Sequence, residues 1–168
     1  ATHSDWVEPI ATEFAGAEIL EIPPNGQGLT ALIALNILGQ FGLRRHDPAS
    51  PERHHLEIEA MKLAWVLRNR HIADPAFAEV PVAELLSPAT AAKLATLIDM
   101  GKAGDVRTTM GQSDTIYLTV VDRQRLAVSF INSVYDGFGV GIVTPRTGIA
   151  LQNRGACFVT DQGHPNCI

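Results

Sequence analysis

Apolar and polar positions divide the chain into a mainly helical first part and a second part with the period of strands. Within residues 1–100 the pattern predicts one short strand, at residues 17–22. Residues 29–41 are rich in Leu, Ile and Ala on most faces of a helix, which predicts a buried helix. Residues 51–71 carry apolar side chains at helical spacing, and a further short helix is expected over residues 89–100.

The expected helices have recognisable starts. Ser50 is a typical N-cap because its side-chain oxygen can accept from a free N–H of the first turn, and Pro51 suits the first helical position. Ser87 and Pro88 form the same kind of start for the last of the expected helices. Residues 23–28 hold two prolines and two glycines, which predicts a rigid loop. The loop lacks the Lys-Ser/Thr of a nucleotide-binding loop, so we expect it to shape the surroundings of a site instead of binding phosphate.

The period changes after a polar, glycine-containing connection at residues 101–113. Residues 115–122 and 125–135 predict consecutive strands joined by a tight turn. Residues 149–153 predict another strand, and Cys157 falls in a segment expected to be a strand followed by a loop. Helices followed by strands indicate an α+β fold.

Composition limits the functional classes. The chain has 168 residues, of which 46% are hydrophobic, so it can bury the core of an ordinary domain. A net charge of -5 and the absence of a basic cluster longer than Arg44-Arg45 argue against a nucleic-acid partner. No apolar run reaches the length of a membrane span of roughly 20 residues, so no membrane partner is expected. Cys157 and Cys167 are expected to be free thiols, with a single disulfide as the alternative.

The histidines do not indicate a metal site. His55 and Glu59 lie four positions apart on one face of the helix expected at residues 51–71. Metal ligation commonly needs three or more convergent ligands, and the spacing offers no further partner, so a surface His–Glu pair is expected. His164 is expected to support a turn. No cofactor is expected.

Thr115 begins the first expected strand of the second part. A threonine exposed as a new N-terminus by chain cleavage can use its own α-amino group as the base for its hydroxyl, so neither His nor Asp is required. On the residue alone, an ordinary β-branched strand residue is the alternative.

The order of several motifs along the chain favours the interpretation of Thr115 as a nucleophile. They run EIPPNGQG, HHLEIEAMKLAW, DTIYLTVVD, FGVGIV, LQNRG and GHPN, and they span nearly the whole chain. This order resembles the gamma-glutamyltranspeptidase family of N-terminal-nucleophile hydrolases. The resemblance implies a four-layer αββα sandwich and a self-processing amidohydrolase or acyltransferase. It would act through an acyl-enzyme on a small amide or γ-glutamyl substrate. A catalytically lapsed homologue with a binding or structural role is the alternative.

The resemblance also assigns individual residues. An ungapped count places Thr115 at the family's nucleophile, so self-cleavage is expected between Asp114 and Thr115. Ser133 falls where the family keeps a Thr hydroxyl beside the nucleophile, and it would orient Thr115; a plain strand serine is the alternative. Residues 1–114 would then end a large subunit, and residues 115–168 would begin a small subunit of the same incomplete domain. The expected partners are the remainders of these two subunits.

The positions that hold substrate depart from the family pattern. Typical transpeptidases bind the substrate's α-amino group with Asn, Gln and Asp, where this chain has Tyr135, Arg154 and Cys157. An Arg repels an ammonium and favours a carboxylate, sulfonate or dicarbonyl group. Arg154 as a solvent-facing strand residue is the alternative. The LQNRGACF segment resembles the branch with oxamate amidohydrolases and cephalosporin-acylase-like proteins.

Further parts of the family's site are expected outside this segment. The oxyanion-stabilising Gly-Gly pair and the Ser-Ser substrate contacts would follow Ile168, and the Arg that grips the substrate carboxylate would precede Ala1. One oxyanion donor contributes about two to three orders of magnitude to the rate, so the segment alone is expected to be inactive. The free-looking cysteines favour the cytoplasm, whereas many relatives are periplasmic or secreted.

Overall fold

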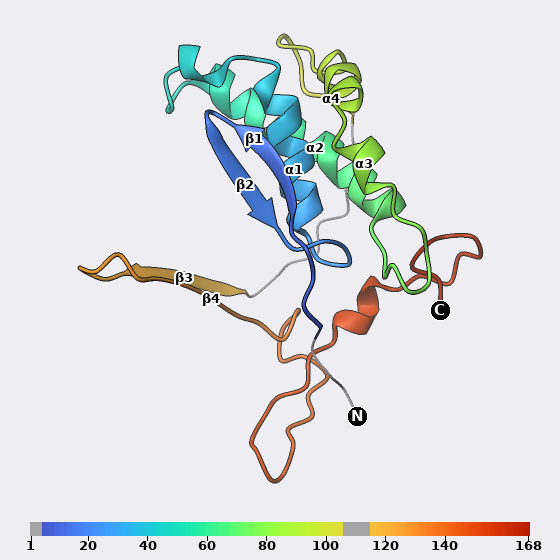
Figure 1. Ribbon diagram of the computed structural model, residues 1–168. Coiled ribbons are helices and arrows are strands. Elements are labelled where there is room, and N and C mark those ends of the chain that lie inside the picture. The colour runs from blue at the N-terminus through green and yellow to red at the C-terminus, as the bar shows by residue number, and fades with distance from the viewer. Residues whose placement is uncertain (1–4, 106–114) are drawn as a thin grey trace. The chain divides into compact units, whose positions relative to one another are not determined.

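The computed structural model describes residues 5–105 and 115–168. The chain divides into two compact units, Ala1–Thr108 with Gln162–Asn166 and Thr109–Asp161 with Cys167–Ile168. Helices and two small antiparallel sheets make up the described parts, which confirms the mixed α and β character (Figure 1). Most of the connection expected at residues 101–113 lies outside the described residues, as does Asp114.

The first unit begins with a hairpin. Strand β1 (Ile10–Phe14) pairs antiparallel with β2 (Ala17–Glu21). Ala15 and Gly16 form the turn with φ of 55° and 85°, and two-residue hairpin turns favour such positive values because they match the strand twist. Only β2 was expected from the sequence. The short β1 contains Ala and Glu as well as apolar residues, and its pairing with β2 makes it a strand.

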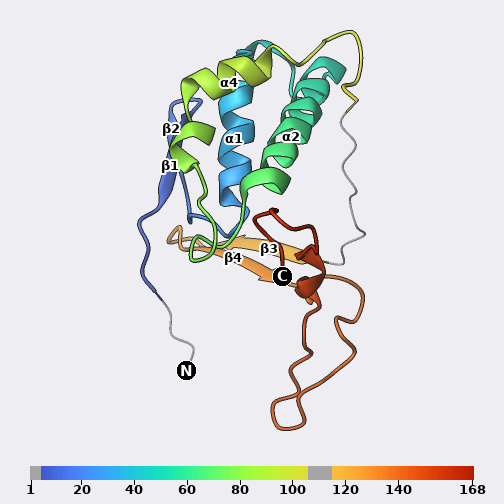
Figure 2. The ribbon, with the colours of Figure 1, turned by 90° about the vertical axis from the view of Figure 1, so that its right-hand side faces the viewer.

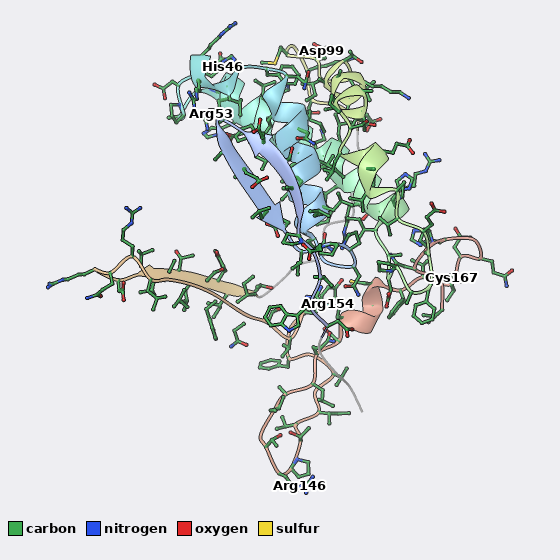
Figure 3. The ribbon with its side chains drawn as sticks, viewed as in Figure 1. His46, Arg53, Asp99, Arg146, Arg154 and Cys167 are labelled. Carbon is green, nitrogen blue, oxygen red and sulfur yellow. The ribbon has the colours of Figure 1, made fainter. Side chains whose placement is uncertain are left out.

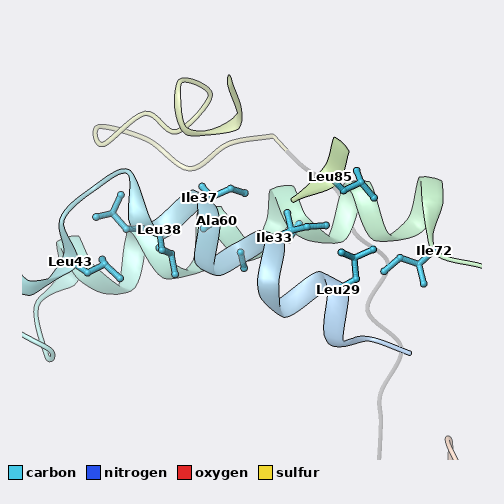
Figure 4. Close-up of a cluster of buried hydrophobic side chains, with 11 residues drawn as sticks. Leu29, Ile33, Ile37, Leu38, Leu43, Ala60, Ile72 and Leu85 are labelled. Carbon is cyan, nitrogen blue, oxygen red and sulfur yellow. The ribbon is translucent and has the colours of Figure 1, made fainter. Parts of the chain in front are cut away.

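Helix α1 (Gly28–Gly39) is the buried centre of the first unit. It contacts both the hairpin and helix α2 (Pro51–His71), and Figure 2 shows it between them. Its apolar side chains form a cluster with those of α2 and the segments that follow (Figure 4). The prediction of a buried helix is therefore confirmed, although the helix stops at Gly39 instead of continuing to residue 41.

The expected helix starts are confirmed. The Ser50 side chain accepts a hydrogen bond from the Arg53 N–H (3.2 Å), and α2 spans the expected residues. Ser87 caps α4 (Pro88–Ala95) through the Thr90 N–H (3.1 Å). Helix α4 ends at Ala95, earlier than expected, and isolated turns follow it. The short helices η1 (Leu43–Arg45) and α3 (Val82–Leu85) were not expected.

The second unit contains a hairpin of β3 (Ile116–Val121) and β4 (Ala127–Asn132). Its expected turn is confirmed, because the Arg125 N–H donates to the Asp122 carbonyl (3.0 Å). Every residue of both strands is exposed, although both strands are rich in apolar side chains on both faces. Strands with two apolar faces are typical of sheets that are covered on both sides.

The strand expected at residues 149–153 is wrong. Ala150 makes only an isolated bridge with Val143, and the following residues form the 3-10 helix η2 (Arg154–Cys157). Apolar residues at 149–151 resemble a strand, but the neighbouring backbone bends too sharply for an extended ladder, with φ of 69° at Gly148.

Candidate functional site

Thr115 lies immediately before β3, and its hydroxyl donates a hydrogen bond to the Ser133 hydroxyl oxygen (3.0 Å). The hairpin register explains this contact. Ile116 pairs with Asn132, so the next position at that end of the hairpin brings residue 115 opposite residue 133. Two hydroxyls that are 18 residues apart in sequence are therefore positioned by backbone pairing.

Ser133 also connects to Tyr135. Its hydroxyl oxygen accepts a hydrogen bond from the Tyr135 N–H (2.9 Å) in addition to the one from Thr115. A serine hydroxyl has two acceptor lone pairs, so both are used by these donors. Tyr135 has a φ of 85°, which is uncommon for a residue with a side chain. The same Ser133 oxygen thus binds the Thr115 hydroxyl and the backbone N–H of Tyr135, a residue in the left-handed conformation.

Arg154 lies against Tyr135. The guanidinium carbon of Arg154, the residue labelled in Figure 3, is 5.1 Å from the centre of the Tyr135 ring, within the range of a cation–π interaction. Arg154 belongs to η2 and is exposed, so it is neither buried nor part of a strand. The structure therefore brings Thr115, Ser133, Tyr135 and Arg154 into one chain of contacts.

Asn153 was not singled out from the sequence. Its side-chain oxygen accepts from the Asp136 N–H (3.1 Å), and its side-chain nitrogen donates to the carbonyls of Asp136 (3.2 Å) and Gly139 (3.4 Å). Its own N–H donates to the Val134 carbonyl (3.1 Å). Asn153 thus ties the loop after Ser133 to the segment that carries Arg154. The available sequence signal was an amide side chain in LQNRG, which follows the glycine-rich run at residues 137–141 along the chain.

The glycine of that run at position 139 is required by close backbone approach. A Cβ there would lie 2.2 Å from the Leu151 carbonyl oxygen, and φ is 66°. Any other residue would have to displace the segment that precedes Asn153.

Comparison with known proteins identifies the family of this chain. The sequence model of Gamma-glutamyltranspeptidase matches residues 2–168. The chain belongs to the gamma-glutamyltranspeptidase family.

Several gamma-glutamyltranspeptidase relatives are similar over most of this chain. The glutathione hydrolase-like YwrD proenzyme of Bacillus subtilis is 37% identical over 168 residues, which cover 100% of this chain and 32% of that protein. The oxamate amidohydrolase proenzyme of Klebsiella pneumoniae is 39% identical over 93% of this chain and 29% of that protein. The chain spans about a third of the length of these curated relatives.

A solved structure supports the same assignment. The cephalosporin acylase from Bacillus halodurans is 41% identical with a TM-score of 0.77, and the match covers 98% of this chain and 30% of that one. The gamma-glutamyltranspeptidase family expected from the motif order is thus confirmed.

Glu59, in the HHLEIEAMKLAW motif, is not the surface residue that the sequence predicted. It is 5% exposed, and its carboxylate accepts from the Lys62 ammonium (2.8 Å) and the Gly104 N–H (3.0 Å). Burial raises the pKa of Glu59, but these two hydrogen bonds and the nearby positive charge outweigh burial and leave the pKa below its ordinary value. His55 instead contacts the Asp99 carbonyl (2.9 Å).

The remaining candidate chemistry is limited. Cys157 and Cys167 are both free, which confirms the expected thiols. Within residues 5–105 and 115–168, no group of three or more His, Cys, Asp or Glu side chains could hold a metal ion. The helices described in those ranges are also too short or too polar to cross a lipid bilayer.

Proposed function

We propose that this chain is the junction segment of a self-processing N-terminal-threonine amidohydrolase or acyltransferase, with Thr115 as the nucleophile. The observation that carries the proposal is the 3.0 Å hydrogen bond from the Thr115 hydroxyl to Ser133 at the start of β3. Two curated relatives are named proenzymes, a name that fits a chain processed after synthesis. Asp114, the other side of the proposed cleavage point, lies outside the described residues.

The proposed cleavage needs only the groups at this junction and one water molecule. The Thr115 hydroxyl oxygen attacks the Asp114 carbonyl carbon, and its proton passes to the amide nitrogen as the C–N bond breaks. The product is an ester between Asp114 and Thr115 with a free α-amino group. Water then hydrolyses this ester, which leaves the Asp114 carboxylate and the Thr115 hydroxyl. Ser133 would orient the attacking oxygen.

Substrate turnover would repeat the same chemistry on a small amide. The freed Thr115 hydroxyl attacks the substrate carbonyl carbon, while its α-amino group accepts the proton and delivers it to the leaving amine. The resulting acyl-enzyme is an ester. Attack by water gives hydrolysis, and attack by a second amine gives acyl transfer.

For the substrate, we propose a small amide that carries an anionic or dicarbonyl group near the scissile bond. Arg154 lies against Tyr135, and the Tyr135 N–H donates a hydrogen bond to Ser133, which supports a role for this cation near the proposed nucleophile. A guanidinium pairs with carboxylates and repels ammonium groups. The relative named oxamate amidohydrolase fits this chemistry.

The rest of the protein is expected to complete the site and the fold. The exposed apolar faces of β3 and β4 would be covered in a four-layer αββα sandwich formed with the remainder of the large and small subunits. Oxyanion donors would also come from outside this segment, so the segment alone would be inactive. Cytoplasmic localisation stays a prediction.

Denaturing mass spectrometry of the full-length protein tests the cleavage. Wild type should give two chains that separate between Asp114 and Thr115, and Thr115→Ala should remain one chain. A wild-type protein that stays intact on prolonged incubation would show that the chain is not self-processing and would favour the lapsed homologue.

Hydrolysis rates for oxamate, a γ-glutamyl anilide and an acyl-β-lactam test the substrate class. We expect oxamate to be preferred, and Arg154→Ala to reduce that preference. A strong preference for the γ-glutamyl compound would reject the role of Arg154.

A further inference from the structure

The C-terminal end of α2 needs hydrogen-bond donors. The last carbonyls of an α-helix have no partner within the helix, and many helices resolve this with a glycine just past the end. Helix α2 ends at His71, and the residues that follow are Ile72, Ala73 and Asp74, with Ile72 extended. A glycine cap is therefore absent at this helix end.

Side chains from the GHPN motif supply donors there. His164 Nε2 lies 2.9 Å from the Asn69 carbonyl oxygen, and Asn166 Nδ2 donates to the Ile72 carbonyl oxygen (2.8 Å). These contacts span 95 and 94 positions of sequence. Gln162–Asn166 accordingly groups with the first unit, whereas the residues on both sides of it group with the second.

The partners of His164 define its hydrogen positions. A carbonyl oxygen only accepts, so Nε2 must donate to Asn69. The Asn166 N–H donates to Nδ1 (3.0 Å), so Nδ1 must accept. The ring is therefore the neutral form with its hydrogen on Nε2. It binds the helix end with one nitrogen and, as expected from the sequence, supports the local turn with the other.

We propose that residues 163–166, the GHPN motif, are a clasp that caps α2 across the cleavage point and holds the two products together. Helix α2 precedes the Asp114–Thr115 bond, and the clasp follows it. Once that bond is cut, the donors belong to the small subunit and the capped helix belongs to the large subunit. This inference rests on the proposed cleavage, which turns contacts within one chain into contacts between two.

Two amide-to-acid substitutions, one in the clasp and one just before it, test this role. Asn166→Asp keeps the side-chain shape but replaces the donor to Ile72 with an oxygen, whereas Gln162→Glu adds the same charge at an exposed position four residues away. In the cleaved full-length protein, Asn166→Asp should speed subunit separation in urea roughly fivefold, as expected for one lost hydrogen bond. Gln162→Glu should leave the rate near wild type. Equal rates in the two variants would overturn the clasp.

Hydrogen exchange in the uncleaved Thr115→Ala chain separates this inference from the proposed cleavage. Asn166→Asp should accelerate exchange of the amides in the last turn of α2, and Gln162→Glu should not. If wild type is never cleaved, the proposed function fails, but this measurement still shows whether residues 163–166 cap the helix. Unchanged exchange in Asn166→Asp would reject the cap even if cleavage occurs.

Discussion

The hydroxyls of Thr115 and Ser133 face each other because the β3–β4 register extends one position past the paired strands. The Ser133 oxygen accepts from Thr115 and from the Tyr135 N–H, so it links the proposed nucleophile to the turn that follows β4.

Removal of the Ser133 hydroxyl should slow self-cleavage. We expect Ser133→Ala to lengthen the processing half-time by about tenfold or more, because Thr115 loses the acceptor that orients it. Ser133→Thr keeps the hydroxyl and should remain close to wild type. Ser129→Ala is a matched control, since that exposed β4 serine bonds Tyr117 and not Thr115. Time-resolved denaturing gels would measure the half-times, and equal half-times for Ser133→Ala and Ser129→Ala would contradict the role.

Asn153 should act through Arg154. Asn153→Asp loses the donor to the Asp136 and Gly139 carbonyls, so the segment with Arg154 should loosen from Tyr135. We expect the KM for oxamate to rise about tenfold with a smaller change in kcat, as for loss of about one charge-assisted hydrogen bond. Asn132→Asp, at the exposed end of β4, controls for the added charge.

A double-mutant comparison distinguishes this positioning role from general destabilisation. In an Arg154→Ala background, Asn153→Asp should change the KM for oxamate little further. Additive effects of the two substitutions would show that Asn153 does not act through Arg154.

Substitution of Gly139 should destabilise the folded protein. Gly139→Ala places a Cβ 2.2 Å from the Leu151 carbonyl oxygen at a φ of 66°, so backbone must move. We expect a loss of about 2 kcal/mol or more in the free energy of unfolding, measured by urea denaturation of the full-length protein. Gly155→Ala has open space around the new Cβ and should be nearly neutral. A stable Gly139→Ala variant would contradict the close approach.

Glu59 should make stability depend on pH in the acid range. Its pKa in the folded state lies below the ordinary value of 4.5, so its stabilising contribution is complete above that value. The contribution is lost as the pH falls through the lowered pKa. Glu59→Gln should therefore flatten the acid side of the stability profile, as measured by thermal unfolding across pH.

The partner of Glu59 gives a second test of the buried pair. Lys62→Met leaves a buried carboxylate with one donor fewer, and we expect a cost of about 1–3 kcal/mol near neutral pH. Arg53→Met removes the partner of the more exposed Glu57 and should cost much less, because exposed ion pairs contribute little. Equal costs would contradict the burial of Glu59.

Local sequence was sufficient for several elements. Ser50 and Pro51 mark the start of α2, and the breaker residues after His71 mark its end, because these preferences depend on neighbouring backbone groups alone. The turn at Asp122 was also predictable for this reason. Motif order identified the family, since several independent patterns had to occur in one sequence.

The missed features depend on contacts between distant segments. Strand β1 required its pairing with β2, and Glu59 looked solvent-exposed until residue 104 was placed over it. The role of Asn153 could be seen only in the folded chain, where its side-chain amide hydrogen-bonds both the backbone N–H and the carbonyl of Asp136.

Chain order and local pattern thus predicted the longer helices α1, α2 and α4, the hairpin turn and the family, and they are the source of the proposed role of Thr115. Only the tertiary structure decided that the Tyr135 N–H shares the Ser133 oxygen with Thr115, which carboxylate is buried, and which donors reach the end of α2. The physical reason is that propensity acts over one or two turns of chain. Burial and hydrogen bonding between segments 45 to 95 residues apart depend on how those segments pack.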